Sequence, residues 1–415
     1  MDEQITAIYR SALMDQLEND RDMSDEEIGE KIDELLSGGQ DLPRVPLSER
    51  MDLRLRLFNS VRRLDILQEL LDDPSITEIM VNGTGGIFLE REGALTCWDR
   101  SFDRREKLED IVQQIVAGCN RTANELTAIV DARLPGGARV NVVMPPVALN
   151  GPIVTIRRFP DDPISMDKLI AWNSITAETV EFLKKLVRAG YNIFISGGTG
   201  SGKTTFLNAL SDFIPKDERI VTIEDNAELQ IRGVPNLVRL EARRANEEGE
   251  GQITIRDLIR ASLRMRPDRI IVGEVRGEET IDMLQSLNTG HDGSLSTGHG
   301  NSPRDMLSRL ETMVLMDLDI PIAAIRRQIA SGIDIMVHLS RMRDKSRRVM
   351  EIIEIDGYDI ATGEIMTHSL YEFVETGEAP DGRLLGKLEK TGSLKNRGKL
   401  QRAGISLEEE EKHER

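Results

Sequence analysis

The chain has 415 residues, which is enough for two or three domains that each bury a hydrophobic core. Its formal net charge of -18 and its aromatic content of 4% disfavour a protein that binds nucleic acid through a basic, base-stacking surface. Cys97 and Cys119 form no CxxC pair, so a thiolate zinc site and a disulfide framework are both disfavoured.

The start of the chain, Met1-Asp2-Glu3-Gln4, lacks the positive charge and the apolar run of a signal peptide. No stretch approaches the ~20 apolar residues that are needed to cross a bilayer. We therefore expect a cytoplasmic protein that associates with a membrane only through partner proteins.

The apolar spacing of residues 1–70 predicts amphipathic helices, and so an N-terminal helical appendage. Ser24-Asp25-Glu26-Glu27 has the pattern of a capping box, Gly38-Gly39 is expected to end that helix, and Ser48 is expected to cap a longer one. Residues 71–159 mix alternating and helical patterns, which predicts a small α+β domain. Its strands are expected at 76–83, 86–90, 138–143 and 153–159, with a helix over 104–129.

Residues 160–163 have the composition of a linker. Over 160–375, helical patterns alternate with apolar strand patterns, which predicts an α/β domain with a mainly parallel sheet and helices on both faces. The strands are expected at 192–196, 220–224, 269–273 and 333–339, followed by a hairpin over 349–374 with a turn at Asp356-Gly357. Residues 376–415 are expected to form a charged C-terminal tail, with Glu408–Glu411 as a solvated end.

Residues 197–204, GGTGSGKT, match the phosphate-loop pattern GxxxxGK[ST]. The segment follows an apolar strand pattern and opens a helical one, where glycine N–H groups can surround phosphate oxygens at a helix N-terminus. Lys203 is expected to reach the β- and γ-phosphates of ATP, and the Thr204 hydroxyl to bind Mg²⁺. The predicted nucleotide-binding residues are Gly198, Thr199, Gly200, Ser201, Gly202, Lys203, Thr204 and Thr205.

Two strand patterns after this loop end in carboxylates. The first is followed by Glu224, Asp225 and Glu228, which would face the nucleotide if they lie beyond the carboxyl end of a parallel strand. Glu224 and Asp225 are then candidate Mg²⁺ ligands and Glu228 a candidate catalytic residue; a solvated strand end is the alternative. The second pattern, 269–273, resembles a Walker B strand and leads to Glu274, our candidate for polarising the attacking water.

Residues 289–301, TGHDGSLSTGHGN, hold two of the five histidines. Zinc is disfavoured because no third ligand stands at the usual spacing. His291 is a candidate nucleotide contact and His299 a candidate catalytic sensor of the γ-phosphate, since imidazole can hydrogen-bond to phosphate or to the catalytic glutamate. A structural role for both histidines is the alternative.

These four elements occur in one order: phosphate loop, acidic strand end, Walker B-like strand, and histidine segment. In that order the chain resembles the secretion-ATPase superfamily of type II secretion, type IV pili and type IV secretion, and within it the CpaF/TadA-like ATPases of Tad/Flp pili. The resemblance covers about residues 65–375. Its motifs are ITEIMVNG (76–83), DARLPGGARVN (131–141), LRMRPDRIIVGEVRGEE (263–279) and LNTGHDGSLSTGHGNSPRDMLSRLETMV (287–314).

The resemblance implies a RecA-like P-loop ATPase domain, joined by a flexible linker to the smaller N-terminal α+β domain. It also implies a homohexamer at the inner face of the cytoplasmic membrane, with inner-membrane platform proteins as partners. Arginines of the N-terminal domain usually complete the family's nucleotide site. Matched by motif, these are Arg133 and Arg139 in DARLPGGAR and Arg157 in TIRRF, with ion pairs inside the fold as the alternative.

The sequence departs from the family pattern at several points. Gly298 and Gly300 stand where relatives often carry a larger residue and alanine, Asn226 stands where retraction motors often have proline, and the four-cysteine zinc insert of type II motors is absent. Two other functions stay open. One is a conjugation-type or DNA-translocating ATPase. The other is a subunit that binds nucleotide without hydrolysing it, for which Gly273 before Glu274 is the best support.

Overall fold

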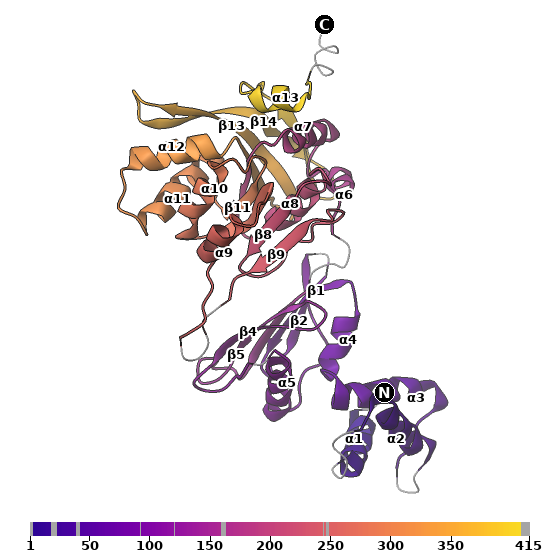
Figure 1. Ribbon diagram of the computed structural model, residues 1–415. Helices are drawn as coiled ribbons and strands as arrows, with labels where there is room; N and C mark the ends of the chain where they lie inside the picture. The colour runs from indigo at the N-terminus through magenta and orange to yellow at the C-terminus, as the bar shows by residue number, and fades with distance from the viewer. Residues whose placement is uncertain are drawn as a thin grey trace. The chain divides into compact units, whose positions relative to one another are not determined.

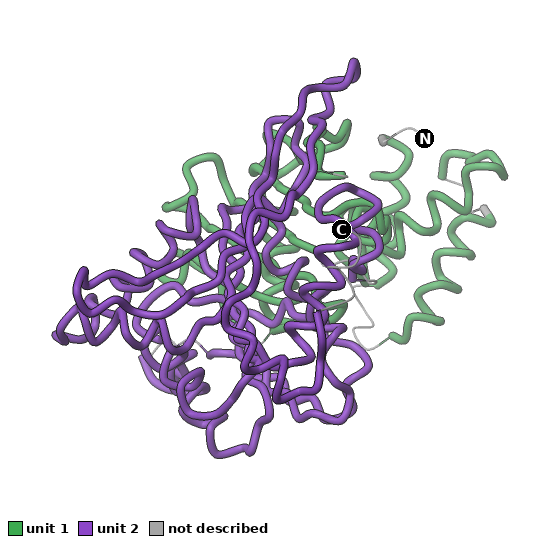
Figure 2. Tube along the Cα trace, turned by 90° about the horizontal axis from the view of Figure 1, so that it is seen from above, with its two compact units in different colours: residues 1–161 green, residues 162–415 purple. Residues whose placement is uncertain are grey.

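The computed structural model describes residues 3–17, 23–38, 42–91, 93–119, 121–158, 163–243, 245 and 249–407. The chain is a mixed α/β protein that folds into two compact units, residues 1–161 and 162–415, which Figure 2 shows in different colours. The predicted linker residues 160–162 and the predicted solvated end 408–411 lie outside the described residues.

The first unit begins with the helices α1 (Glu3–Leu17), α2 (Asp25–Gly38), α3 (Leu47–Arg62) and α4 (Ile66–Asp72). The first three bury a common apolar core, as the predicted helical appendage requires. The capping box is confirmed, because the Ser24 N–H donates to Glu27 at 2.7 Å and the Glu27 N–H donates to the Ser24 hydroxyl at 3.3 Å. The predicted cap at Ser48 is wrong, because α3 already begins after Pro46, whose φ of -55° suits entry into a helix.

The remainder of this unit is an α+β fold. Its strands are β1 (Ile76–Asn82), β2 (Ile87–Arg91), β3 (Ala94–Cys97), β4 (Ile129–Arg133), β5 (Arg139–Val143) and β6 (Ile153–Arg157). They form an antiparallel sheet in the order β3-β2-β1-β6-β5-β4, against which α5 (Arg105–Ala117) packs. The helix predicted to reach residue 129 ends at Ala117, because Gly118 follows and Asn124 then accepts the N–H groups of Leu126 and Thr127 in a turn that leads into β4.

The second unit contains the strands β7 (Ile193–Gly197), β8 (Ile220–Glu224), β9 (Leu237–Glu241), β10 (Arg269–Val275), β11 (Leu295–His299), β12 (Ile335–Arg341), β13 (Arg347–Asp359), β14 (Glu364–Glu378) and β15 (Leu384–Lys390). Their order in the sheet is β15-β14-β13-β12-β7-β11-β10-β8-β9. The segment from β12 to β9 is parallel, and β13 to β15 continue it antiparallel. The mainly parallel sheet expected from the sequence is therefore confirmed.

Helices cover both faces of this sheet, as Figure 1 shows. They are α6 (Met166–Ala171), α7 (Ala177–Arg188), α8 (Lys203–Ser211), α9 (Ile255–Ser262), α10 (Glu279–Leu287), α11 (Pro303–Leu315), α12 (Ile322–Gly332) and α13 (Gly398–Ala403). Helices α6, α7, α8 and α13 share a core with Ile193 and Ile195, whereas α9 to α12 share the other core with Phe194. Successive side chains of β7 thus enter opposite cores, as the strand geometry requires.

The C-terminal part of the sheet differs from the expectation. Asp356-Gly357 is not the hairpin turn: Gly357 lies inside β13 at a bulge, with φ of 117°. The segment expected to be a charged tail from residue 376 instead completes β14 and forms β15 and α13. Leu388 and Leu400 are buried in the core of the second unit, because the charges of this segment alternate with apolar residues that face inward.

Candidate functional site

The phosphate loop follows β7, a strand with parallel neighbours on both sides. A Cβ at Gly197 would lie 2.4 Å from the Leu339 carbonyl oxygen, so a side chain there would collide with the backbone of β12. Gly200 and Gly202 have φ values of 71° and 92°, which glycine adopts without strain. Because α8 begins at Lys203, its first N–H groups and positive dipole end lie at the loop, an arrangement that suits phosphate.

Lys203 is buried beside this loop, with 8% of its surface exposed. Its Nζ donates to the Gly198 carbonyl oxygen at 3.1 Å and lies 3.3 Å from Nδ1 of His299. Burial lowers the pKa of Lys203, while the nearby Glu274 carboxylate opposes that shift. An ammonium group can only donate, so Nδ1 of a neutral His299 accepts, and the ring proton is on Nε2.

Glu274 lies on the other side of His299. Nε2 of His299 is 2.7 Å from Oε1 of Glu274, and Arg276 donates from Nη2 to Oε2 at 2.7 Å. The two atoms of the histidine contact are close enough for an ion pair, but they are not aligned for a hydrogen bond. Oε1 of Glu274 is buried, and no described residue forms a hydrogen bond with it. Burial and then Lys203 lower the pKa of His299, which keeps the imidazole neutral at pH 7. Lys203, His299 and Glu274 thus form one continuous cluster.

Glu224 ends β8 as a buried carboxylate. Its Oε1 accepts the backbone N–H groups of Glu228 and Leu229, both at 2.8 Å, whereas no described residue hydrogen-bonds to its Oε2. Burial raises the pKa of Glu224 to about 7, although the two N–H groups act in the opposite direction. Asp225 is exposed. The hydrogen bond to Glu274 raises the pKa of Arg276, and the negative charges of Asp225 and Glu228 raise it further. The acidic end of β8 therefore lies next to Arg276, the hydrogen-bond partner of Glu274.

The glycine in front of Glu274 has a steric explanation. A Cβ at Gly273 would lie 2.9 Å from Cγ of Glu224, closer than side chains pack. The position where many Walker B strands carry aspartate is thus filled by Glu224 from the neighbouring strand β8. The glycine is required by packing here and is not itself a sign of lost catalysis.

The two histidines of the histidine segment lie at opposite edges of the sheet. His299 ends β11 opposite Gly197, beside the phosphate loop. His291 precedes β11 at the amino edge, where its Nδ1 lies 3.2 Å from the Ser286 carbonyl oxygen and 3.3 Å from the Thr289 hydroxyl. The structure therefore does not bring His291 to the phosphate loop, because the strand β11 separates it from His299.

Gly298 and Gly300 depart from the family pattern for a packing reason. A Cβ at Gly298 would lie 2.8 Å from Phe194 Cζ and 2.9 Å from Met306 Cε, and one at Gly300 would lie 3.0 Å from Met306 Cβ. Phe194 and Met306 thus occupy the space that larger residues would need.

The three predicted arginines form a row in the first unit. Arg133 of β4 is directly opposite Arg139 of β5, and Arg139 is directly opposite Arg157 of β6. Directly opposite residues lie on the same face of a sheet, and like charges in such pairs are destabilising. A row of three arginines is therefore an arrangement that favours an anionic ligand or acidic neighbours.

The residues near the loop fit Mg²⁺ bound with a nucleotide. Across the described ranges no three His, Cys, Asp or Glu side chains gather into a ready-made metal site. Mg²⁺ commonly uses one or two protein oxygens together with phosphates and water, so it does not need such a cluster. The unpartnered Oε2 of Glu224 and the hydroxyl of Thr204, near the start of α8, are hard oxygen ligands of the required kind.

Two further residues of the site had not been predicted. Arg276 hydrogen-bonds to Glu274 and lies in the quoted motif 263–279, where its position two residues after the glutamate could have indicated a role. Arg347 donates from Nε to the Gly200 carbonyl oxygen at 2.9 Å. Nothing in the sequence around Arg347 indicates that contact.

A phosphate loop after a central parallel strand, with acidic residues at the ends of neighbouring strands, defines a RecA-like P-loop nucleotide-binding domain. The chain belongs to the family of type II/IV secretion system proteins, whose family model matches residues 61–376. Within the described residues, no helix is both long and apolar enough to span a membrane.

Individual relatives agree with this assignment. A putative conjugal transfer protein of Mycobacterium tuberculosis is 36% identical over 294 residues, which cover 69% of this chain and 83% of that protein. The type IV secretion system protein PtlH of Bordetella pertussis is 32% identical over 327 residues, covering 71% and 94%. The solved structure of the Legionella pneumophila ATPase DotB shares the fold, with a TM-score of 0.51 and 21% identity over 75% of this chain and 82% of that one.

Proposed function

We propose that the chain is a Mg²⁺-dependent ATPase that works as a homohexameric motor of pilus assembly or protein secretion. The observation that carries the proposal is the cluster of Lys203, His299 and Glu274 at the phosphate loop. It links a phosphate-binding cation to a carboxylate whose buried Oε1 has no hydrogen-bond partner among the described residues. A purely structural glycine-rich turn would not require such an assembly.

In the proposed reaction, water attacks the γ-phosphate of ATP in line with the leaving oxygen. The backbone N–H groups of 198–205 and the Lys203 ammonium stabilise the negative charge of the phosphates. Glu274 orients the water through Oε1 and accepts its proton, and Arg276 keeps the carboxylate in place. Neutral His299 contacts both Lys203 and Glu274, so it is positioned to respond when the γ-phosphate is lost.

Mg²⁺, held by Thr204 and Glu224 with Asp225 as a further candidate, would neutralise phosphate charge. Glu228 would contribute to catalysis indirectly, because its negative charge stabilises the charged form of Arg276, which hydrogen-bonds to Glu274. The arginine row of Arg133, Arg139 and Arg157 would supply further positive charge to a nucleotide.

The specific machine that we propose is a Tad/Flp pilus, because the sequence motifs quoted above resemble those of the ATPases of such pili. Platform proteins of the inner membrane are the proposed partners, and the cytoplasmic face of that membrane is the proposed location. The work stroke proposed from the resemblance is a hinge-like conformational change driven by hydrolysis. No direct contact with nucleic acid is part of the proposal.

The test measures steady-state phosphate release with Mg-ATP by the wild type, Lys203→Ala and Glu274→Gln. Nucleotide binding and thermal unfolding are measured beside it. We expect Lys203→Ala to lose binding and turnover, and Glu274→Gln to lose turnover by roughly 100-fold or more while it still binds ATP. A Glu274→Gln protein that hydrolyses ATP at the wild-type rate would refute the assigned role of Glu274.

A conjugation ATPase is the second candidate, because the M. tuberculosis relative carries a conjugal transfer name. The net charge of -18 and the 4% aromatic content argue against direct DNA translocation. Titration with single- and double-stranded DNA at low salt separates the two. Binding that weakens steeply with salt would favour the conjugation machine, and no binding would favour protein or pilin export.

A further inference from the structure

The turn between β12 and β13, residues 342–346, lies beside the phosphate loop but outside the catalytic cluster. Arg347, which follows it, donates from Nε to the carbonyl oxygen of Gly200 at 2.9 Å. Its stem lies along the loop, since a Cβ at Gly202 would be 3.4 Å from Arg347 Cδ. One side chain therefore contacts the loop at Gly200 and lies beside Gly202, two glycines whose φ values are in the left-handed region.

The contact acts on a peptide group of the phosphate loop whose N–H, that of Ser201, donates to the Gly198 carbonyl oxygen at 3.3 Å. The Gly200 carbonyl and the Ser201 N–H belong to one peptide, so a charge-assisted hydrogen bond to the oxygen polarises the N–H. Arg347 thus stabilises the loop turn in which the Ser201 N–H bonds to the Gly198 carbonyl oxygen. An anion that took over this N–H would polarise the same peptide and strengthen the Arg347 contact.

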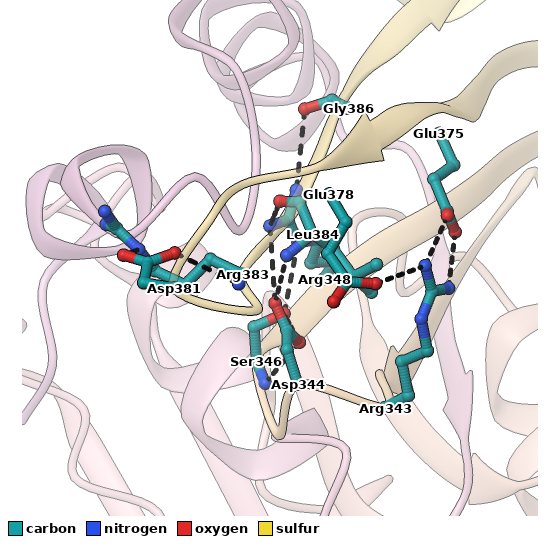
Figure 3. Close-up of polar contacts among 10 residues, drawn as sticks. All are labelled: Arg343, Asp344, Ser346, Arg348, Glu375, Glu378, Asp381, Arg383, Leu384 and Gly386. Carbon is teal, nitrogen blue, oxygen red and sulfur yellow. Dashed lines mark hydrogen bonds and ion pairs between the residues drawn. The ribbon is translucent and has the colours of Figure 1, made fainter.

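The same turn is bound on its other side to the far end of the sheet, as Figure 3 shows. Asp344 accepts the backbone N–H of Leu384 at 2.8 Å. Arg348 donates to the Leu384 carbonyl oxygen at 2.6 Å and is buried. Arg343 donates to the two carboxylate oxygens of Glu375 at 2.9 and 2.6 Å.

These bonds hold the end of β14 and the start of β15, which flank the connection 379–383, to the turn. Leu384 is held on both sides of its Cα: its N–H donates to Asp344, and its carbonyl oxygen accepts from Arg348. A displacement of Arg347 would pass to its neighbour Arg348 along one strand, because both begin β13. The phosphate loop and the β14–β15 connection are therefore joined by a short, fully bonded path.

We propose that Arg347 is a positioning residue that couples the phosphate loop to the β14–β15 connection, so that a bound nucleoside diphosphate or triphosphate stiffens that end of the sheet. This inference rests on one part of the proposed function, namely that the phosphate loop binds a nucleotide. It does not require that the protein hydrolyses ATP. Coupling of this kind is reciprocal, so a partner that holds 379–384 would raise nucleotide affinity by the same factor.

The experiment is amide hydrogen exchange with and without saturating ADP and Mg²⁺, read at the Leu384 N–H. The proteins are the full-length wild type, Arg347→Ala, Arg347→Lys and Arg341→Ala. Arg341 is the matched control: it is exposed and lies opposite Arg347 in the strand register, and its side chain makes no hydrogen bond or ion pair with any described residue. Thermal unfolding confirms that each variant is folded.

ADP is expected to slow exchange at Leu384 in the wild type and in Arg341→Ala. Arg347→Ala should lose this response and bind ADP about three- to tenfold more weakly, the effect of one lost hydrogen bond. Arg347→Lys, which can still donate to the Gly200 carbonyl, should keep part of the response. Partial rescue by lysine would not be expected if Arg347 served only to fill space.

Asp344→Asn tests the path from its other end. It leaves every atom of Arg347 unchanged but offers one accepting oxygen in place of two for the N–H groups of Ser346 and Leu384. We expect wild-type ADP affinity without the exchange response. If ADP still slowed exchange at Leu384 in Arg347→Ala or in Asp344→Asn, the proposed coupling would be wrong. It would also be wrong if the wild type bound ADP without any change in exchange at Leu384. A wild type that binds no nucleotide would overturn both this inference and the proposed function.

Discussion

Replacing Gly273 by alanine tests the packing that explains the unusual Walker B strand. The added Cβ would meet Cγ of Glu224 at 2.9 Å, whereas ordinary contacts begin at 3.4 Å. Glu224 cannot retreat without strain, because it is buried and its Oε1 holds the N–H groups of Glu228 and Leu229. Loss of those bonds would cost about 1 kcal/mol each, and overpacking of a core costs ~1–3 kcal/mol. We therefore expect Gly273→Ala to lower the free energy of unfolding by ~1–3 kcal/mol, and Gly273→Asp by more.

Urea unfolding followed by circular dichroism measures this change, with phosphate release as a second readout. Gly277→Ala is the matched control, since a Cβ there would lie at an ordinary 3.5 Å from Glu279 and the backbone is not in the left-handed region. It should stay within ~0.5 kcal/mol of the wild type. If Gly273→Ala unfolded at the wild-type urea concentration with full activity, the steric explanation for the missing aspartate would be wrong.

Three further predictions concern stability. Burial lowers the pKa of His338 below its ordinary value of 6.5. At a pH near or below 6.5 the unfolded chain therefore binds more protons than the folded chain, and the free energy of unfolding falls as the pH drops below 6.5. His338→Gln should therefore narrow the difference in melting temperature between about pH 7.5 and about pH 5.5. Arg269 is buried, and its Nη2 donates to Oε1 of Glu218 at 2.8 Å. Arg269→Met should therefore lower the free energy of unfolding, measured in urea, by ~3–5 kcal/mol. A loss smaller than ~1 kcal/mol would contradict a stabilising role for this ion pair. Ser24→Ala should cost ~0.5–2 kcal/mol and speed amide exchange in the first turn of α2, whereas exchange in α5 stays unchanged.

The sequence was sufficient where the signal is local. Strands such as β1, β7 and β8 are short apolar or alternating runs bounded by turn residues, and all were predicted to within about two residues. The phosphate loop was recognisable because its glycines, lysine and threonine are consecutive. Glu274 and Glu224 could be placed near it because parallel strands share one carboxyl edge.

The sequence was insufficient where contacts join distant positions. The Arg347 contact to Gly200 spans 147 positions and depends on how the turn after β12 is built. His291 and His299 look equivalent in sequence, but β11 runs between them and carries them to opposite edges. β15 was missed because lysines and glutamates on its exposed face make the segment resemble a solvated tail.

His299 has a consequence for genetic dissection of this protein. Its two ring nitrogens contact Lys203, the proposed phosphate-binding residue, and Glu274, the proposed residue that orients the attacking water. Any His299 substitution therefore alters both neighbours at once and cannot separate the two functions. Glu274→Gln, which preserves the shape of the side chain, is the change suited to trapping a nucleotide-loaded protein that does not hydrolyse ATP. A His299 allele would instead report the sum of two defects.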